Sequence, residues 1–220
     1  MRYWFLRGIM RVLVATILGH RVHVEGLNNV PQHGGALLVG NHVGTVDPPL
    51  TGALIPRLDV HYMAKSEHFA RRWVRWLFRG FHAFPVVRGS ADRAALRHTL
   101  DLLREGHIVL VYPEGSRSPD GRLREPQAGV GFLARHGGVP VIPVAVWGTE
   151  KVLPRGSTRI HRAEVHVRYG PPVALPAGDA SARSDNRAVA AAIMGAISEM
   201  LPQRYRAAVE SETPATTPAA

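Results

Sequence analysis

Residues 36–48 read Ala-Leu-Leu-Val-Gly-Asn-His-Val-Gly-Thr-Val-Asp-Pro, and this stretch decides the fold class. Its first four residues form a short apolar run that predicts a buried strand over residues 36–39. Asp47 followed by Pro48 is typical of a helix start, with Asp47 as the N-cap and Pro48 in the first turn. A buried strand that leads through a polar loop into a helix is the repeating unit of an α/β sheet.

The same pattern continues on both sides of this stretch. Short apolar runs bounded by Gly or Pro alternate with segments of helical period, so we expect an α/β fold with a largely parallel central sheet flanked by helices. The predicted strands cover residues 22–25, 36–39, 60–64, 82–86, 108–112, 141–146 and 164–169. The predicted helices cover residues 48–54, 67–79, 91–105, 127–136 and 183–201.

The length of 220 residues fits one medium-sized domain with short extensions. We expect the domain to cover residues 21–201, with a separate helix over residues 1–20 before it. Residues 202–220 end in Thr, Pro and Ala, a composition that predicts a disordered tail.

The first 20 residues favour an amphipathic helix that lies in a membrane surface. The apolar run at residues 12–18 is far shorter than the ~20 residues needed to span a bilayer, and no small-residue cleavage site follows it. Arg7 and Arg11 are four residues apart and would share one helix face. Aromatic residues that suit a membrane interface stand near the start, at Tyr3, Trp4 and Phe5. The alternative is a first helix that packs on the core.

A second segment, residues 69–79, interleaves aromatic residues with arginines. On one helix Phe69, Trp73 and Trp76 would share a face, which suits either an anionic membrane surface or a core-facing stripe. Lys and Arg together exceed Asp and Glu by 27 − 17 = 10. Such a surface attracts the phosphates of nucleic acid, anionic lipid or small metabolites.

The composition also excludes several classes of site. Cysteine is absent, so disulfides and thiolate metal clusters are impossible. The 12 histidines are scattered, and His20 and His23 are the only two that lie closer than five residues apart. We therefore expect no metal and no cofactor.

The loop at residues 41–47 places a histidine and a carboxylate where they can act together. His42 follows the predicted strand, and a turn can bring the Asp47 carboxylate within hydrogen-bonding reach of its imidazole. A carboxylate so placed holds the ring in one tautomer, and the other ring nitrogen is then free to take a proton from a hydroxyl. The pair predicts general-base catalysis, unless Asp47 serves only as a helix cap.

A second polar motif, Glu114-Gly-Ser-Arg-Ser118, follows the strand predicted at residues 108–112. Gly115 permits a close approach of the backbone to a ligand, and Arg117 offers a planar fork that suits phosphate. Arg88 ends another predicted strand. Because open α/β sheets bind ligands beyond their strand ends, we expect an anion site at the same edge as His42.

Four motifs in this order resemble the sequence blocks of the glycerolipid acyltransferases, and most closely those of the bacterial 1-acylglycerol-3-phosphate acyltransferases. They are Asn41-His42 with Asp47, Phe84-Pro-Val-Val-Arg88, Glu114-Gly-Ser-Arg-Ser118 and Val139-Pro-Val-Ile-Pro143-Val. The resemblance covers about residues 20–175 and implies the fold of that family, an α/β domain like that of glycerol-3-phosphate acyltransferase.

The resemblance implies that His42, held by Asp47, deprotonates the acceptor hydroxyl, which then attacks the thioester of acyl-CoA or acyl carrier protein. The implied acceptor is a lysophospholipid, lysophosphatidic acid, and the product is phosphatidic acid. Glu114 is expected to shape the acceptor pocket. The acceptor phosphate is expected to bind Arg88, Gly115, Ser116 and Arg117. The enzyme is expected to act as a peripheral or monotopic protein on the cytosolic face of the cytoplasmic membrane, with an anionic membrane surface and no nucleic acid among its partners.

The sequence departs from the family pattern at two places. Val87 stands where many relatives have an acidic residue, and Gln127-Ala128 stand where they have Phe-Lys. These departures leave a modified headgroup or a glycolipid open as the acceptor. Two non-enzymatic alternatives also remain at this point: a basic nucleic-acid-binding protein, which gives His42 no role, and a lipid-binding protein without turnover.

Overall fold

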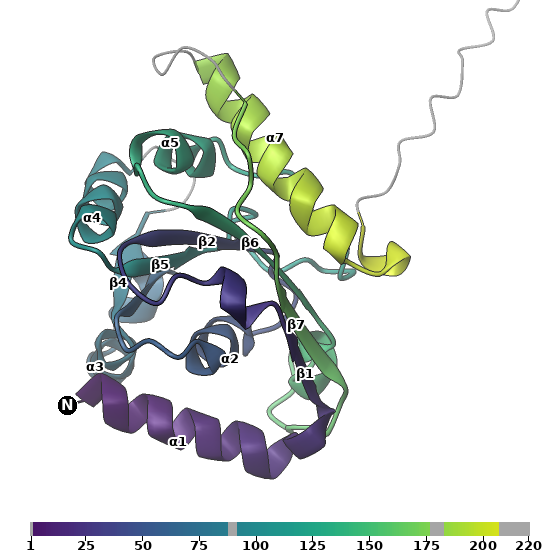
Figure 1. The fold of residues 1–220 in the computed structure, drawn as a ribbon. Coiled ribbons are helices and arrows are strands. Elements are labelled where there is room, and N and C mark those ends of the chain that lie inside the picture. The colour runs from purple at the N-terminus through teal and green to yellow at the C-terminus, as the bar shows by residue number, and fades with distance from the viewer. Residues whose placement is uncertain (1, 88–91, 177–182, 207–220) are drawn as a thin grey trace, which may run out of the picture.

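The structure is a computed structural model that describes residues 2–87, 92–176 and 183–206. The described residues form one seven-stranded sheet with the strand order β1-β7-β6-β2-β5-β3-β4 (Figure 1). The strands are β1 (Val22–Glu25), β2 (Ala36–Gly40), β3 (Val60–Lys65), β4 (Ala83–Val86), β5 (Ile108–Val111), β6 (Val141–Trp147) and β7 (Val165–Tyr169).

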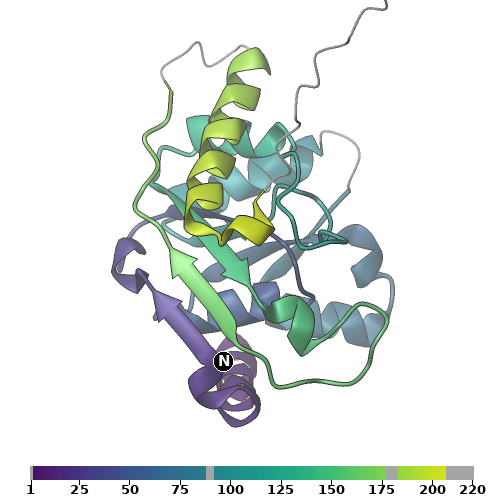
Figure 2. The same cartoon turned by 90° about the vertical axis from the view of Figure 1, so that its right-hand side faces the viewer.

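Most of this sheet is parallel, as the sequence predicts. Strands β6, β2, β5, β3 and β4 run in one direction. Strand β7 is antiparallel to β6, and β1 runs parallel to β7. Figure 2 shows the arrows of β6 and β7 pointing in opposite directions. The predicted α/β class is therefore confirmed.

Helices cover both faces of the sheet. Figure 1 shows α1 (Arg2–Ile17), α2 (Asp47–Leu54) and α3 (Arg72–Gly80) on one face. The other face carries α4 (Arg93–Arg104), α5 (Gly129–His136) and α7 (Arg183–Met200), while the short α6 (Thr149–Val152) follows β6. Because both faces are covered, the central strands are apolar throughout. In β2, Leu37 and Val39 pack toward α4, α5 and α7, whereas Ala36 and Leu38 pack toward α1 and α2.

The start of α2 differs from the prediction for Asp47. Asp47 is the first residue of the helix, and the N-cap position belongs to Val46, which makes no side-chain cap hydrogen bond. The Asp47 carboxylate accepts hydrogen bonds from the backbone N–H groups of Val43 and Gly44, both at 2.8 Å, and so turns back toward the loop after β2. Its role as an N-cap is wrong, and its carboxylate is available to the candidate site.

Helix α1 lies across α2 and uses one face for that contact. Tyr3, Leu6 and Leu18 are buried, and the buried Arg7 donates hydrogen bonds to the carbonyl oxygens of Ala53 and Ile55. Arg7 is thus buried, whereas Arg11, one turn further along the helix, is exposed. No helix in the described part of the chain combines the length and the apolar character needed to cross a bilayer.

The outer face of α1 remains apolar. Its exposed apolar side chains are Trp4, Phe5, Ile9, Val12 and Leu13. One face of this helix therefore packs on the domain, while the other leaves a large apolar surface in solvent. That the helix lies in a membrane surface stays a prediction.

The helix predicted at residues 67–79 is interrupted. A 3-10 helix, η3 (Ser66–Phe69), is followed by Arg71 in an extended conformation, and α3 begins at Arg72. The break separates the expected aromatic face, because Phe69 is buried whereas Trp73 and Trp76 are exposed.

The folded domain extends beyond its predicted end at residue 201. Residues Gln203–Tyr205 form the 3-10 helix η4. Tyr205 is buried, and its carbonyl oxygen accepts a hydrogen bond of 2.8 Å from the backbone N–H of Leu123. The rest of the predicted tail, residues 207–220, lies outside the described residues.

Candidate active site

His42 and Asp47 form a hydrogen-bonded pair where β2 ends. The Nδ1 atom of His42 lies 2.8 Å from Oδ2 of Asp47, which is fully buried, while the His42 side chain is 13% exposed. A carboxylate can only accept at this distance, so Nδ1 carries the proton and Nε2 presents a lone pair. Within the described residues Nε2 makes no hydrogen bond. The imidazole therefore has the tautomer that a general base requires.

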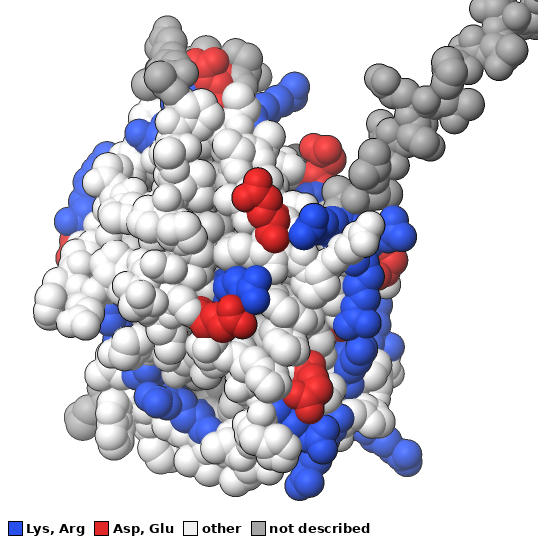
Figure 3. Space-filling model, turned by 45° about the vertical axis from the view of Figure 1, so that its right-hand side comes forward, with Lys and Arg blue, Asp and Glu red and all other residues white. Residues whose placement is uncertain are grey.

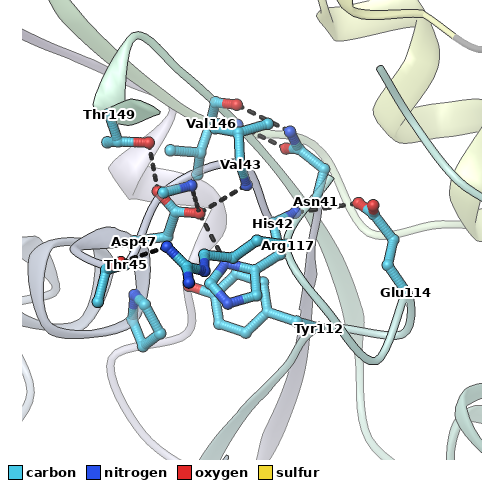
Figure 4. A network of polar contacts seen from close by, with 12 residues as sticks. Asn41, His42, Val43, Thr45, Asp47, Tyr112, Glu114, Arg117, Val146 and Thr149 are labelled. Atoms are coloured by element: carbon cyan, nitrogen blue, oxygen red, sulfur yellow. Dashed lines mark hydrogen bonds and ion pairs between the residues drawn. The ribbon is translucent and has the colours of Figure 1, made fainter. Parts of the chain in front are cut away.

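The Asp47 carboxylate is held on both oxygens. Besides the contacts of Oδ2 with the loop, Oδ1 accepts a hydrogen bond from the hydroxyl of Thr149, which is also fully buried (Figure 4). Thr149 opens α6, directly after β6. A Cβ at Gly44 would lie 2.6 Å from the Thr149 hydroxyl oxygen, so only glycine allows the loop to approach so closely. The carboxylate is consequently fixed before any substrate arrives.

Two neighbours fix the position of His42 itself. The side-chain amide of the buried Asn41 forms two hydrogen bonds of 2.8 Å with the backbone of Val146, which ties the end of β2 to β6. The ring of Tyr112 lies against the imidazole with a centroid distance of 4.7 Å. These contacts restrict the ring to one orientation.

Glu114 lies on the other side of His42 from Asp47 (Figure 4). Its Oε1 accepts a hydrogen bond of 3.0 Å from the His42 backbone N–H, and its Oε2 is buried with no partner within the described residues. Burial raises the pKa of this carboxyl to about 7, although the His42 N–H and the nearby Arg124 oppose the shift. Glu114 is thus able to accept or donate a hydrogen bond through Oε2 near neutral pH.

The raised pKa of Glu114 predicts a pH dependence of stability. The protonated carboxyl is favoured in the folded state, so its contribution is fully present below the ordinary pKa of 4.5 and is lost as the pH rises through about 7. Glu114→Gln retains a hydrogen-bond acceptor but does not titrate. We expect the variant's melting temperature, relative to wild type, to increase between pH 4.5 and pH 8 in calorimetric scans. A difference that stays constant with pH would contradict a raised pKa.

Arg117 reaches from the loop after β5 to the loop after β2. Its guanidinium donates a hydrogen bond of 2.7 Å to the hydroxyl of Thr45, and Figure 4 shows the side chain extending past His42. Gly115 has a φ of +70°, and a Cβ there would meet the side chain of Gln127, so the turn requires glycine. The Ser116 hydroxyl accepts a hydrogen bond from Arg124.

The structure thus gathers six of the seven predicted site residues at one sheet edge. Strands β2, β5 and β6 are adjacent and parallel, and the segments that follow them carry His42, the 114–117 turn and Thr149. Arg88 lies outside the described residues. Strand β4, which precedes it, ends at Val86 at the same edge, with β3 between β4 and β5.

Sequence reasoning missed three contributors to the pair. They are Asn41 as a clamp, the ring of Tyr112 and the hydroxyl of Thr149, and the first two have no signature in a single sequence. Thr149 could have been suspected from its position alone, because it follows the strand predicted at residues 141–146 and so lies at the edge where ligands bind.

Comparisons with known proteins identify the family of this chain. The model of a family described as Acyltransferase matches residues 21–147. The 1-acyl-sn-glycerol-3-phosphate acyltransferase of Bacillus subtilis is 32% identical over 147 residues, which cover 66% of this chain and 71% of that protein. The chloroplastic 1-acyl-sn-glycerol-3-phosphate acyltransferase LPAT1 of Arabidopsis thaliana is 30% identical over 64% of this chain, and the match spans only 40% of its own length.

A solved structure supports the same assignment. The crystal structure of PlsC, the 1-acyl-sn-glycerophosphate acyltransferase of Thermotoga maritima, superimposes with a TM-score of 0.67 and 25% identity, covering 88% of this chain and 78% of that one. The family match includes His42, Asp47 and the 114–117 turn. This chain belongs to the acyltransferase family, and it is an O-acyltransferase of the glycerolipid type.

Proposed function

We propose that the protein transfers a fatty acyl group from the thioester of acyl-CoA or acyl carrier protein to the free hydroxyl of lysophosphatidic acid, forming phosphatidic acid. The observation that carries this proposal is the bond between His42 Nδ1 and Asp47, which leaves Nε2 without a partner within the described residues. The names of the relatives support the choice of acceptor.

His42 is the base in the proposed reaction. Nε2 takes the proton of the acceptor hydroxyl as its oxygen attacks the thioester carbonyl, and the Asp47 carboxylate stabilises the imidazolium that forms. When the tetrahedral intermediate collapses, the carbon–sulfur bond breaks and the thiolate takes this proton from Nε2. Atoms and charge balance without an enzyme nucleophile, because the thioester is already activated.

The acceptor is proposed to lie across the turn at residues 114–117. Arg117 presents a planar guanidinium that suits two phosphate oxygens, and Arg88 would approach from the end of β4. The unpaired Oε2 of Glu114, when protonated, offers a hydrogen bond to an ester oxygen of the acceptor. No cofactor has a part in this scheme.

Replacing Arg117 with Ala is expected to weaken acceptor binding more than chemistry. The guanidinium would contact the phosphate in the ground state and in the transition state alike, so the acceptor KM should rise about tenfold or more while kcat changes by less than about threefold. Steady-state kinetics with varied acceptor measures both constants. Arg97→Ala, which removes an exposed charge on α4, is the matched control. A fall in kcat with an unchanged acceptor KM would contradict the assignment.

We further propose that α1 and α3 dock the enzyme on the cytosolic face of the membrane. Trp73 and Trp76 are exposed on α3, and α3 contacts α1, whose outer face carries its own exposed aromatic and aliphatic side chains. Arg71, Arg72 and Arg79 are exposed in the same segment, which suits anionic headgroups.

The variant Trp73→Ser/Trp76→Ser is expected to bind vesicles of phosphatidylglycerol and phosphatidylcholine at least tenfold more weakly than wild type. The variant lacks two large apolar side chains that the wild type would bury in the membrane interface. Sedimentation with sucrose-loaded vesicles measures the partition. Ile160→Ser removes an exposed apolar side chain from the loop between α6 and β7 and should leave binding unchanged. Equal binding of the double variant and wild type would remove α3 from the docking surface.

The identity of the product tests the function. Purified enzyme is incubated with an acyl thioester and one acceptor at a time: lysophosphatidic acid, another lysophospholipid or a glycolipid. Mass spectrometry should detect phosphatidic acid as the dominant product. Transfer to a different acceptor would keep the acyltransferase assignment and replace the acceptor.

A further inference from the structure

A hollow of about 560 Å³ opens beside the candidate site and has no part in the scheme above. It lies where three segments meet: the loop after β5, helix α6 and η4 near the carboxyl end of the described chain. Its lining residues are Asp120, Gly121, Arg122, Glu150, Lys151, Arg204 and Tyr205.

One oxygen of each carboxylate in this hollow accepts internal hydrogen bonds. Oδ1 of Asp120 accepts from the Ser118 hydroxyl at 2.9 Å and from the Arg122 backbone N–H at 3.0 Å. Oε1 of Glu150 accepts from the Tyr205 hydroxyl at 2.7 Å. Burial raises the pKa of Tyr205 to about 12, so the phenol keeps the proton that it donates.

The cations of the hollow make few contacts with its carboxylates. Within the described residues the Arg122 guanidinium and the Lys151 ammonium form no ion pair, and Arg204 contacts only the ring and hydroxyl of Tyr205 among the hollow's lining residues. Three cations and two carboxylates therefore line the hollow, a net charge of 3 − 2 = +1, and the local field favours an anion. Oε2 of Glu150, by contrast, is buried without a hydrogen-bond donor within the described residues. A ligand that carries both a phosphate and N–H or O–H donors satisfies both features.

The hollow is connected to both members of the catalytic pair. Ser118, whose hydroxyl holds Asp120, donates its backbone N–H to the His42 carbonyl oxygen at 2.8 Å. Glu150 directly follows Thr149, whose hydroxyl holds Asp47. A molecule bound here would contact two of the segments that position the catalytic pair.

The surface next to the hollow is also basic. The segment from Lys151 to Arg162 contains Arg155 and Arg159 as well, all four exposed, and it has no acidic residue. Figure 3 shows Lys and Arg side chains gathered in a column along the right-hand edge of this face, whereas the acidic residues there are scattered.

We propose that this hollow binds the phosphorylated pantetheine arm of the acyl donor, with the phosphate on Arg122, Lys151 and Arg204. The inference rests on the proposed function, which requires a thioester donor. The arm carries one phosphate together with hydroxyl and amide donors, and it is the same whether CoA or a carrier protein holds it. The acceptor phosphate is assigned to Arg117, which lies in the same loop after β5 as Arg122. The two anionic substrates would therefore approach His42 from different parts of that loop.

The test compares two donors that differ by one phosphate. Wild-type enzyme receives acyl-phosphopantetheine or acyl-pantetheine, with the acceptor held at saturation. The phosphate is expected to lower the donor KM about tenfold or more. In Arg122→Ala/Lys151→Ala this discrimination should fall to less than about threefold, while the acceptor KM stays unchanged. Arg93→Ala/Arg97→Ala removes two exposed charges from α4 and should retain full discrimination.

Binding without turnover separates this proposal from the proposed function. Calorimetric titration with phosphopantetheine that carries no acyl group needs no reaction, and affinity should fall about tenfold in Arg122→Ala/Lys151→Ala but not in Arg93→Ala/Arg97→Ala. Parallel assays with acyl-CoA and acyl carrier protein identify the source, because the natural donor has the lower KM in wild type.

Two results would overturn the proposal even if acyl transfer is confirmed. One is that both charge variants bind phosphopantetheine with equal affinity, and the other is that the wild-type enzyme has the same KM for donors with and without the phosphate. Loss of affinity in the first variant alone would uphold the site even if lysophosphatidic acid is not acylated.

Discussion

His42→Ala is expected to lower kcat by about 10³-fold, because the variant has no group at Nε2 to take the acceptor proton. The loss should appear in thiol release and in lipid product alike, and the donor and acceptor KM values should change little. The melting temperature should remain close to wild type, since the His42 ring is partly exposed and its backbone contacts with Glu114 and Ser118 do not need the imidazole.

The control for His42→Ala is His33→Ala. His33 is exposed and precedes β2, at the opposite edge of the sheet from the site. This variant should retain full activity. If His42→Ala turned over at the wild-type rate in a coupled thiol assay, the base would have to be another residue.

Asp47→Asn is expected to lower kcat by about 10²-fold with less than a threefold change in acceptor KM. The amide oxygen can still accept from His42, Val43 and Gly44, and its NH2 group can donate to the Thr149 hydroxyl, so the geometry is retained. What is lost is the negative charge that stabilises the imidazolium during transfer. Steady-state kinetics at saturating donor separates the two constants.

Asp101→Asn provides the matched control for Asp47→Asn. Asp101 is an exposed carboxylate on α4 that pairs with Arg104, and its neutralisation should leave kcat unchanged. A rise in acceptor KM with a normal kcat for Asp47→Asn would show that this carboxylate acts on the acceptor and not through the imidazole.

The parallel part of the fold could be predicted because its signal is local. The buried strands β2, β5 and β6 read as continuous apolar runs, since helices cover both of their faces, and their predicted bounds differ from the observed ones by at most one residue. Helix boundaries were less predictable where tertiary contacts decide them. The helix is interrupted between Phe69 and Arg72, next to the buried Phe69, and the periodicity of the sequence does not reveal this break.

The candidate site shows the same division between local and long-range information. His42 and Asp47 are five residues apart, so one turn brings them together and the pair is visible in the sequence. The groups that hold the pair come from further along the chain, with Glu114 72 residues from His42 and Thr149 102 residues from Asp47. Such contacts depend on the order β6-β2-β5 in the sheet, which a single sequence does not specify.

The N-terminal helix illustrates a third case. The pattern of residues 2–17 fits a surface helix, yet Arg7 is buried and bonds to backbone carbonyl groups at the end of α2. A guanidinium can be buried in this way because the end of a helix offers carbonyl oxygens without partners. The aromatic residues Trp4 and Phe5 stay on the outer face, so the helix both packs on the domain and exposes an apolar surface.

Direct transfer from donor to acceptor is the most demanding part of this account, and the intact mass of the enzyme tests it. Wild-type protein is mixed with excess acyl thioester in the absence of acceptor, quenched at times from milliseconds to minutes, and weighed by mass spectrometry, with thiol release measured in parallel. If His42 acts only as a base, the mass stays constant and thiol appears only after lysophosphatidic acid is added. A burst of thiol accompanied by an added acyl mass would reveal an acyl-enzyme and contradict the mechanism.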